Sequence, residues 1–465
     1  MKLTNKFLIG FMAIAACGCG QKQSDNPLLN DFTTPYGIAP FEEITIDNYR
    51  EGILLGMEEQ KAEIEAIINN PEEPTFQNTI VAMDQSGKLL RKVRGTFSPL
   101  TSSNSTEESR ALEKELSPLM SAHSDDINLN EKLFARVKKV YDNRENIKLT
   151  PEEKTVLENI YKRFVNSGAE LSETEKEKLR ELNQQLSMLE LTFSQNLLHE
   201  TNNTFVVANS LEELKGLPQA NIDAAAKMAA DNGQPGKWMF NMQRPSCNPV
   251  LQYCENRDLR KKVYDAYYNR GNTGNEYDSK EICRQLVTLR LEKAKLMGYN
   301  NYAEMVLEDR MAKTPEAVFE LLDQVWEPAV AKAKEELDDI RAEIRKEGKD
   351  FEPAGWDYMY YLDKAKRAKY SVDEQEIREY MEINNVMKGV FHVATQLYGV
   401  TFKEITADVP AYDPTAKAYE VIDKDGTVLA IFYSDNYPRE SKRAGAWCTS
   451  FRGQSYEGEE RIIPI

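Results

Sequence analysis

The chain has 465 residues, of which 41% are hydrophobic and 29% charged, and its formal net charge is −17. Length and composition predict a folded protein of two or three domains rather than a disordered chain. The negative charge argues against nucleic acid as a partner, because binding phosphates requires a basic surface, and it leaves peptides and small molecules as candidates.

The N-terminus has the pattern of a targeting segment. Lys2 and Lys6 precede an apolar run at residues 7–14, which is too short to span a bilayer. Ile14-Ala15-Ala16-Cys17 resembles the bacterial lipobox, so we predict a lipoprotein signal peptide at residues 1–17 with lipidation at Cys17. A secretory signal with Ala13-Ile14-Ala15 as its cleavage site is the alternative. The lipidated chain would be anchored to the membrane in the cell envelope, facing the periplasm or the outside, with residues 18–35 as a tether.

Residues 36–200 read as an N-terminal helical lobe. Thr150-Pro151-Glu152-Glu153 and Ser172-Glu173-Thr174-Glu175 are capping boxes that predict helix starts. After the second box, apolar residues recur every three or four positions and form one stripe that is typical of core packing: Leu179, Leu182, Leu186, Leu189, Phe193 and Leu197.

Residues 201–249 interrupt the helical pattern with clustered Asn, Gly and Pro, and we interpret them as a mixed linker. Its strand candidates are Phe205-Val206-Val207 and Trp238-Met239-Phe240. Residues 250–465 then form part of a second helical lobe. Helices are predicted at 256–268, at 280–297 and from Pro315 to near Gly348, with a kink or break at Pro328. Trp356, Tyr360 and Tyr361 either line a groove or pack half-buried.

The pattern turns to strand near the C-terminus. Two β-prone runs at 419–422 and 427–433 flank Asp423-Lys424-Asp425-Gly426, which predicts a hairpin. The second run is nearly all apolar, so we expect it to be buried on both faces. A basic loop follows, and the apolar run Arg461 to Ile465 predicts a strand that is cut short.

The sequence assigns no catalytic residue and no metal ligand. Of the three histidines, His123 and His392 have no partner in the sequence pattern. His199-Glu200-Thr201-Asn202-Asn203 begins like H-E-x-x-H but has Asn where the second histidine should be, so we interpret His199 as an exposed helix-end residue. Cys247, Cys254, Cys283 and Cys448 contain no C-x-x-C pair and are open to disulfides or to free thiols.

Several segments together resemble the thimet oligopeptidase family of zinc peptidases, most closely its bacterial dipeptidyl carboxypeptidase (peptidyl-dipeptidase) branch. They are Asn256-Arg257-Asp258-Leu259-Arg260 with Tyr264-Asp265-Ala266-Tyr267 and Arg270-Gly271, Leu289 to Tyr299 with Asn301-Tyr302-Ala303, Trp356-Asp357-Tyr358 with Tyr360-Tyr361, and Tyr433-Ser434-Asp435 with Tyr437-Pro438-Arg439 and Lys442-Arg443. The resemblance covers nearly all of the mature chain. It implies a mainly α, two-lobed fold around a deep channel, with a small β-sheet beside the active site.

The resemblance also implies a zinc cofactor and release of C-terminal dipeptides from peptides. In the family, zinc sits on an H-E-x-x-H helix just C-terminal of the segment that matches residues 418–465, so no residue here inherits a metal role. We therefore expect an inactive fragment with an incomplete catalytic lobe. A non-catalytic lipoprotein that binds peptides or a partner is one alternative, and a split enzyme with a separately encoded C-terminal half is another.

One family role can be carried over, namely substrate binding by an edge strand near Gly445, Ala446 and Trp447. In the family this strand runs beside the bound peptide, which fits strand addition. A strand that only packs is the alternative. Arg439, Lys442 and Arg443 would either attract a peptide carboxylate or form a solvated basic loop.

Overall fold

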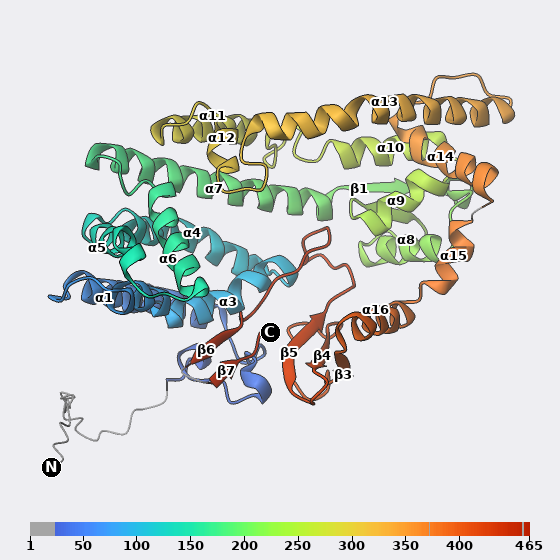
Figure 1. Cartoon of the computed structure of the whole chain (residues 1–465). Coiled ribbons are helices and arrows are strands. Elements are labelled where there is room, and N and C mark those ends of the chain that lie inside the picture. The colour runs from blue at the N-terminus through green and yellow to red at the C-terminus, as the bar shows by residue number, and fades with distance from the viewer. Residues whose placement is uncertain (1–23, 372, 458–459) are drawn as a thin grey trace, which may run out of the picture.

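The computed structural model describes residues 24–371, 373–457 and 460–465. The predicted signal peptide, including Cys17, lies outside these residues. The described chain is mainly α-helical with small antiparallel sheets toward the C-terminus, as predicted (Figure 1).

The N-terminal part is a stack of helices. Their bounds are α1 Ile46–Ile68, α2 Ala82–Gln85, α3 Lys88–Ser103, α4 Glu107–Asn128, α5 Glu131–Asp142, α6 Pro151–Asn166 and α7 Glu173–Asn203. The predicted start of α6 is confirmed, because Thr150 N–H donates to the Glu153 carboxylate at 2.7 Å and its hydroxyl accepts from Glu153 N–H at 3.2 Å. These reciprocal bonds satisfy two donors that a helix start leaves open.

The apolar stripe of α7 is covered over only part of its length. Leu179, Leu182 and Leu186 are buried, whereas Leu197 near the other end is 36% exposed. Core packing is therefore confirmed for the first half of the stripe and does not extend to its end.

A small two-stranded sheet and three helices follow. Their bounds are β1 Phe205–Ala208, α8 Gln219–Asp231, β2 Trp238–Asn241, α9 Arg244–Tyr253 and α10 Arg257–Tyr268. β1 and β2 pair antiparallel, with Phe205 opposite Asn241 and Ala208 opposite Trp238, so both predicted strands are confirmed. Their core includes Cys247 and Cys254, and the four cysteines of the described chain are free, with Cys283 and Cys448 exposed.

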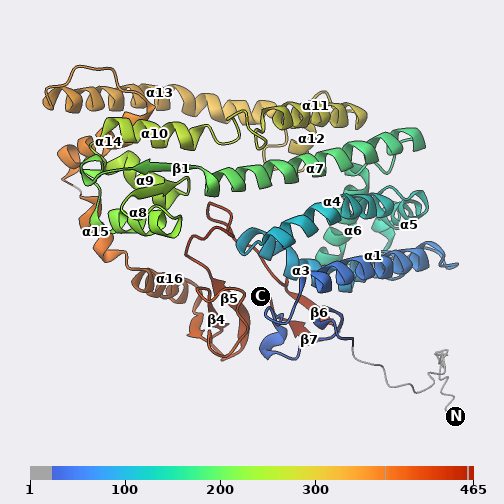
Figure 2. The ribbon, with the colours of Figure 1, turned by 180° about the vertical axis from the view of Figure 1, so that it is seen from behind.

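The next helices form the outermost layer and then descend toward the C-terminal sheet (Figures 1 and 2). Their bounds are α11 Lys280–Leu296, α12 Tyr302–Leu307, α13 Pro315–Lys346, α14 Gly355–Tyr370, α15 Glu374–Tyr380 and α16 Ile383–Tyr398. Of the kink or break predicted at Pro328, the break is wrong, because α13 runs through that residue as one helix, and the kink stays a prediction. Residues 321–329 are all exposed, so water can solvate the carbonyl that loses its donor to the proline.

The C-terminal strands form the predicted hairpin and two additions to it. Their bounds are β3 Thr401–Glu404, β4 Lys417–Ile422, β5 Val428–Ser434, β6 Ser455–Glu457 and β7 Glu460–Ile462. The order in the larger sheet is β3-β4-β5, and β6 pairs with β7. The expectation that the second hairpin strand is buried on both faces is wrong, since Ile431 is buried while Phe432 is 40% exposed. The sheet packs a core on one face, and α16 covers part of the other face through Phe391, which contacts Phe402 and Tyr419.

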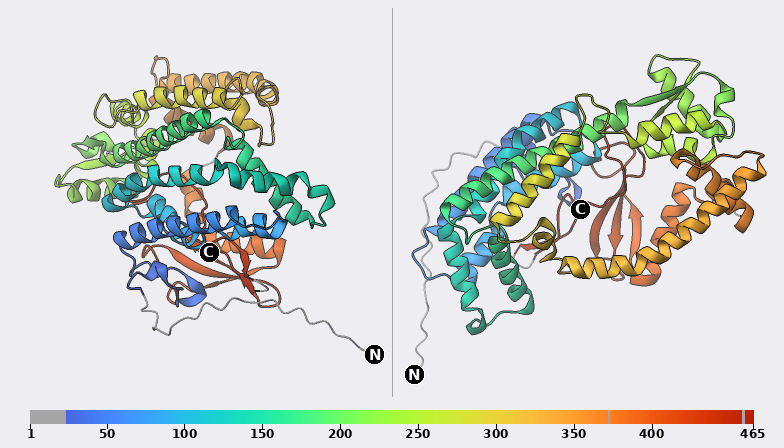
Figure 3. Two further views of the ribbon diagram at one scale, coloured as in Figure 1. Left: turned by 90° about the vertical axis from the view of Figure 1, so that its left-hand side faces the viewer. Right: turned by 90° about the horizontal axis from the view of Figure 1, so that it is seen from above.

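Segments from the two ends of the described chain share the core under this sheet. Ile38 is buried against Ile431, and Ile463 and Ile465 pack on the same cluster. The Arg452 guanidinium donates to two carbonyls near Ile38, at 2.8 and 3.2 Å. Figure 3 shows the strands beside the first part of the described chain. The predicted last strand is confirmed as β7, which ends at Ile462.

Candidate peptide-binding segment

The segment that leaves β5 begins in a buried ion cluster. The Asp435 carboxylate accepts two hydrogen bonds from the Arg439 guanidinium, at 2.7 and 2.8 Å, and lies 3.0 Å from Lys442 Nζ. The Tyr412 hydroxyl donates to Asp435 at 3.1 Å, and Asp413 lies 3.3 Å from Arg439 Nε. Burial raises the pKa of Asp435, but the hydrogen bonds from the two cations outweigh it and hold that pKa below its ordinary value.

This cluster corrects the prediction for the basic loop. The side chains of Arg439 and Lys442 are only 17% and 12% exposed and are paired with Asp435, so they are neither solvated nor available to a peptide carboxylate. The third basic residue, Arg443, is exposed. Sequence spacing could not reveal this difference, because a loop has no fixed direction in which successive side chains point.

Residues 439–443 bridge two helix ends. Arg443 N–H donates to the Ser102 carbonyl at 2.9 Å, and the Ser441 carbonyl accepts from Ser105 N–H at 2.9 Å, both just at the end of α3. On the other side, the Asn202 side chain near the end of α7 donates to the Glu440 carbonyl at 2.8 Å. The bridge therefore fixes where the following residues lie relative to both helices.

Residues 444–447 follow the bridge and are mostly exposed. Gly445 has φ +110°, in the region that favours glycine. Trp447 is half-buried, with the Arg443 guanidinium 5.4 Å and Lys442 Nζ 5.8 Å from its ring centroid. Both cations lie within the range of a cation–π interaction, which holds the indole against the bridge.

The predicted edge strand at Gly445, Ala446 and Trp447 is not formed. Within the described residues, no hydrogen bond engages the backbone of 444–447, so no neighbouring strand holds it extended. The predicted role in peptide binding stays a prediction. The free donors and acceptors beside an aromatic ring are what an extended peptide needs in order to pair by strand addition.

The end of α7 holds a second loop, which sequence reasoning missed. Glu200 is 2% exposed, and its carboxylate accepts hydrogen bonds from Gly271 N–H, the Thr273 hydroxyl at 2.9 Å and the Asn275 side chain at 2.8 Å. Burial raises the pKa of Glu200, but these donors outweigh it and hold the pKa below its ordinary value. The only sequence signal was an acid in a failed H-E-x-x-H pattern.

His199 lies near the end of α7, as predicted, but the prediction that it is exposed is wrong. α7 continues to Asn203, and His199 is half-buried with its ring stacked on Tyr277, at a centroid distance of 3.7 Å and an interplanar angle of 17°. The residue therefore packs the same loop that Glu200 holds.

The described residues do not fit a zinc site. His123 Nε2 lies 2.8 Å from the Gln60 side-chain oxygen, and His392 is exposed on α16. Across residues 24–371, 373–457 and 460–465, no group of three or more His, Cys, Asp or Glu is placed to hold a metal ion. We therefore assign no metal-dependent step to these residues.

Comparison with known proteins identifies the family. Residues 250–464 match the model described as Peptidase family M3. The chain is 36% identical over 431 residues to dipeptidyl carboxypeptidase of Escherichia coli, which covers 92% of this chain and 63% of that protein. It is 35% identical to dipeptidyl carboxypeptidase of Salmonella typhimurium, with 95% and 65% covered, and 30% identical to oligopeptidase A of Haemophilus influenzae, with 91% and 62% covered.

The second half of the chain therefore matches peptidase family M3. The resemblance to the thimet oligopeptidase family, close to dipeptidyl carboxypeptidase, is confirmed. The chain spans less than two thirds of the length of each of these three relatives.

The comparisons contradict the predicted envelope location. The M3 relatives are dipeptidyl carboxypeptidases and oligopeptidases A, and one of them, 30% identical, is named a probable cytosolic oligopeptidase A of Arabidopsis thaliana. Among the helices that the structure describes, none is long and apolar enough to cross a bilayer. The prediction rested on the pattern at residues 1–17, which lie outside the described residues.

Within the M3-matched region, Trp356-Asp357-Tyr358 marks a structural anchor. Asp357 is fully buried and pairs with Arg257 at 2.7 Å and with Arg260 at 2.8 Å, which joins α10 to α14. Burial raises the pKa of Asp357, but the arginines and the Ala354 N–H hold it below its ordinary value. Tyr360 and Tyr361 are buried too, which decides for packing and against a groove.

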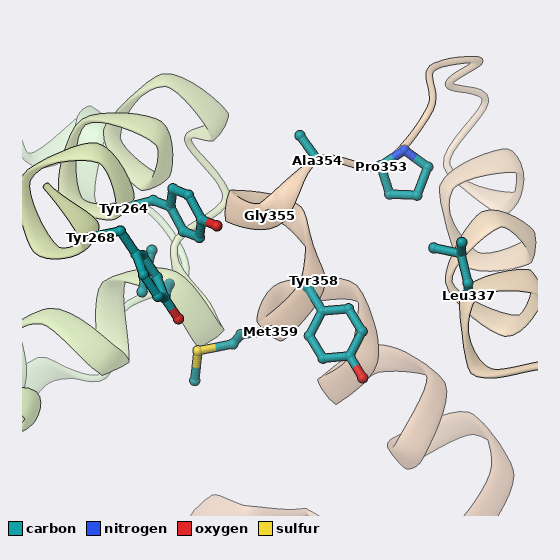
Figure 4. Close-up of a pocket in the computed structure, with 9 residues that line it drawn as sticks. Tyr264, Tyr268, Leu337, Pro353, Ala354, Gly355, Tyr358 and Met359 are labelled. Atoms are coloured by element: carbon teal, nitrogen blue, oxygen red, sulfur yellow. The ribbon is translucent and has the colours of Figure 1, made fainter. Parts of the chain in front are cut away.

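An open cavity of about 330 Å³ lies beside this M3 anchor, between α10, α13 and α14. Figure 4 shows Tyr264 and Tyr268 on one side, Leu337 on the other, and Tyr358 and Met359 between them. A Cβ at Gly355 would lie 2.3 Å from the Tyr264 hydroxyl oxygen, so glycine permits this close approach. The lining is aromatic and aliphatic and holds no carboxylate, histidine or cysteine, so we read it as a packing gap rather than a reaction site.

Proposed function

We propose that the protein acts in peptide hydrolysis and that the complete enzyme releases dipeptides from peptide C-termini. The 36% identity over 431 residues to a protein named dipeptidyl carboxypeptidase carries this proposal. Zinc is the metal expected for family M3, and the described residues provide no group to hold it. We therefore also propose that the 465-residue chain does not hydrolyse peptides by itself.

The test is a zinc and activity measurement on this chain. We expect far less than one zinc per chain and no cleavage of an N-blocked tripeptide with a free C-terminus. Stoichiometric zinc together with release of the C-terminal dipeptide would contradict the proposed inactivity. Cleavage that releases a single C-terminal residue would contradict the dipeptidyl specificity.

Peptide binding without catalysis is a second candidate, and residues 444–447 favour it. Their backbone makes no hydrogen bond within the described chain, and Trp447 offers an aromatic surface beside them. Exposed Arg443 is the candidate for contact with a peptide carboxylate. Binding would bring an extended peptide against 444–447 with its C-terminus toward Arg443.

Cys448 offers a reporter next to this segment. It is exposed, as is Cys283, whereas Cys247 and Cys254 are buried and should not react with a thiol probe. A fluorophore on Cys448 in a chain with Cys17→Ser, Cys19→Ser and Cys283→Ser should respond saturably to the blocked tripeptide. The matched control carries the fluorophore on Cys283 in a chain with Cys17→Ser, Cys19→Ser and Cys448→Ser. Equal responses from both labels, or none from Cys448, would contradict binding at 444–447.

A further inference from the structure

A second cavity of about 330 Å³ lies where α8, α9 and α15 meet, in a corner of the molecule that Figures 1 and 2 show from both sides. Among the described residues that line it are two arginines, Arg244 of α9 and Arg378 of α15, and no aspartate or glutamate. The whole chain has 76 acidic residues against 59 lysines and arginines. A cavity whose described charged residues are both cations is therefore an exception in this acidic protein, and its field favours an anion.

Neighbouring residues hold Arg244 in place. Its Nε donates to the Tyr267 hydroxyl oxygen at 3.4 Å, and the Arg270 guanidinium lies 4.0 Å from the centroid of the Tyr267 ring. The terminal nitrogens of Arg244 and the whole Arg378 guanidinium have no hydrogen bond or ion pair with the residues that the structure describes. Two guanidinium groups without a counter-ion match a carboxylate, which accepts paired hydrogen bonds from such groups.

Helix α9 adds uncharged polar groups to the same cavity. Asn248 and Gln252 follow Arg244 at intervals of four residues, so the three side chains share one side of the helix. Pro245 and Pro249 also line the cavity, and Pro249 has no N–H to donate to the Pro245 carbonyl, which therefore lacks its ordinary helical donor. A ligand that carries an N–H or ammonium group beside its carboxylate thus finds acceptors on α9.

An acid that contacts the cavity lining is already paired. Asp363 accepts a hydrogen bond from Gln252 at 3.1 Å, but its side chain is 8% exposed and lies 2.8 Å from Arg367 Nε. Arg367 therefore compensates the charge of Asp363, and this acid does not neutralise Arg244 or Arg378.

We propose that this cavity binds a small peptide with free ends. Its carboxylate lies between Arg244 and Arg378, and its N–H groups face the acceptors of α9. The volume falls in the range of small-molecule sites and exceeds what a bare phosphate fills, so an inorganic oxyanion is the less suitable occupant. None of the described lining residues belongs to 444–447, although Gln243, next to Arg244, donates to the Arg439 carbonyl at 3.4 Å. Only the further step, that the bound peptide is the released dipeptide, rests on the proposed function.

Ligand-detected NMR titration of the 465-residue chain with alanyl-alanine tests the proposal. We expect saturable binding with a Kd of about 1 mM, which suits a small ligand held by two charged donors. The C-terminal amide of the same dipeptide lacks the carboxylate and should bind more weakly by about tenfold or more. Added salt should also weaken the binding of alanyl-alanine, because the attraction is electrostatic.

A double variant assigns the binding to the cavity. Arg244→Gln with Arg378→Gln should weaken the binding of alanyl-alanine by about tenfold or more, because it removes both charged donors. The matched control, Arg310→Gln with Arg345→Gln, removes the same charge outside the cavity and should change the affinity by no more than about twofold. All four side chains are exposed, so both double variants should keep the melting temperature of the parent.

The same measurements define the failure of the proposal. No saturable binding, or equal weakening by the two double variants, would overturn it, because the cavity would then contribute nothing specific. Equal affinity for inorganic phosphate and alanyl-alanine would overturn it as well, since α9 would add nothing to recognition. Binding that survives Arg244→Gln with Arg378→Gln but is lost in Trp447→Ala would place the dipeptide at 444–447 instead. Zinc content and cleavage, which test the proposed function, do not enter the titration, so either proposal can fail without the other.

Discussion

Asp357 and Asp435 are each paired with two cations, yet the two clusters have different roles. Asp357 is fully buried, whereas the Asp435 side chain is 10% exposed. Asp357 joins α10 and α14 through Arg257 and Arg260, and Tyr360 and Tyr361 are buried with it. Asp435 pairs with Arg439 and Lys442. The backbone of residues 440–443 forms hydrogen bonds with residues at the ends of α3 and α7, and the exposed residues 444–447 follow. The first cluster stabilises a core, whereas the second fixes the position of a loop.

The largest effect should come from the first cluster. Asp357→Asn leaves Arg260, which is 1% exposed, without a counter-charge in the interior. Breaking a buried pair in this way costs about 3–5 kcal/mol in the free energy of unfolding. Urea denaturation measures it. Asp338→Asn is the control, because its ion pair with Arg341 is exposed and should be worth about 0–1 kcal/mol. Equal losses from the two variants would remove the distinction between a core anchor and a surface pair.

The contrast also explains what the sequence could and could not predict. Helix starts such as Thr150 and stops such as Gly298, with φ +87°, follow from bonds between near neighbours, so the helix bounds were predictable. The hairpin around Gly426 was predictable for the same reason. The contact of Arg443 with Ser102 joins residues more than 300 positions apart, and no local rule could anticipate it.

The candidate site was therefore located only in part. The family resemblance placed it near Trp447, yet it predicted a strand where the structure has a loop with free backbone groups. The ion pairs of Arg439 and Lys442 with Asp435 could not be predicted from their spacing, because all three residues lie in one irregular segment whose side-chain directions the sequence does not fix. Glu200 was missed because its partners lie in a loop about 70 residues away.

The second cluster should show a smaller global loss with a larger local one. Asp435→Asn weakens charged hydrogen bonds worth about 1.5–3 kcal/mol, while Asp413 remains near Arg439. Relative to the parent, we expect the Asp435→Asn variant to speed up amide exchange more at residues 439–447 than in α10 and α14. Asp408→Asn, an exposed acid near the same sheet, is the control. Uniform loss of protection across the chain would mean that Asp435 stabilises a core as Asp357 does.

A third carboxylate sharpens the comparison through pH. Burial raises the pKa of Glu347, but Lys349, Lys364 and the Tyr361 hydroxyl outweigh it and lower the pKa from 4.5 to about 2. A lowered folded-state pKa gives stability that is present above pH 4.5 and is lost as the pH falls toward 2. Glu347→Gln should cost about 1 kcal/mol at pH 7, because the pair is partly solvated, and it should flatten the loss between pH 4.5 and 2. Urea denaturation at pH 7 and pH 3 measures the unfolding free energy of both chains. An equal loss of unfolding free energy in parent and variant between these pH values would contradict the role given to Glu347.

The smallest stability effect and the clearest functional one should come from Trp447. Its ring is half-buried and contacts the cations of Lys442 and Arg443, so Trp447→Ala should cost about 0.5–1 kcal/mol in unfolding free energy. The same change removes the aromatic surface beside the free backbone of 444–447 and should weaken binding of the blocked tripeptide by about tenfold.

The Cys448 fluorophore reports that affinity, and Trp238→Ala controls for loss of an indole elsewhere, since Trp238 packs in the β1–β2 core. Trp238→Ala should lower stability more than Trp447→Ala and leave the affinity of the folded chain unchanged. If the two variants instead lower affinity in proportion to their loss of stability, the loop beyond Asp435 is only another packed surface, and the difference between the two aspartate clusters has no functional meaning.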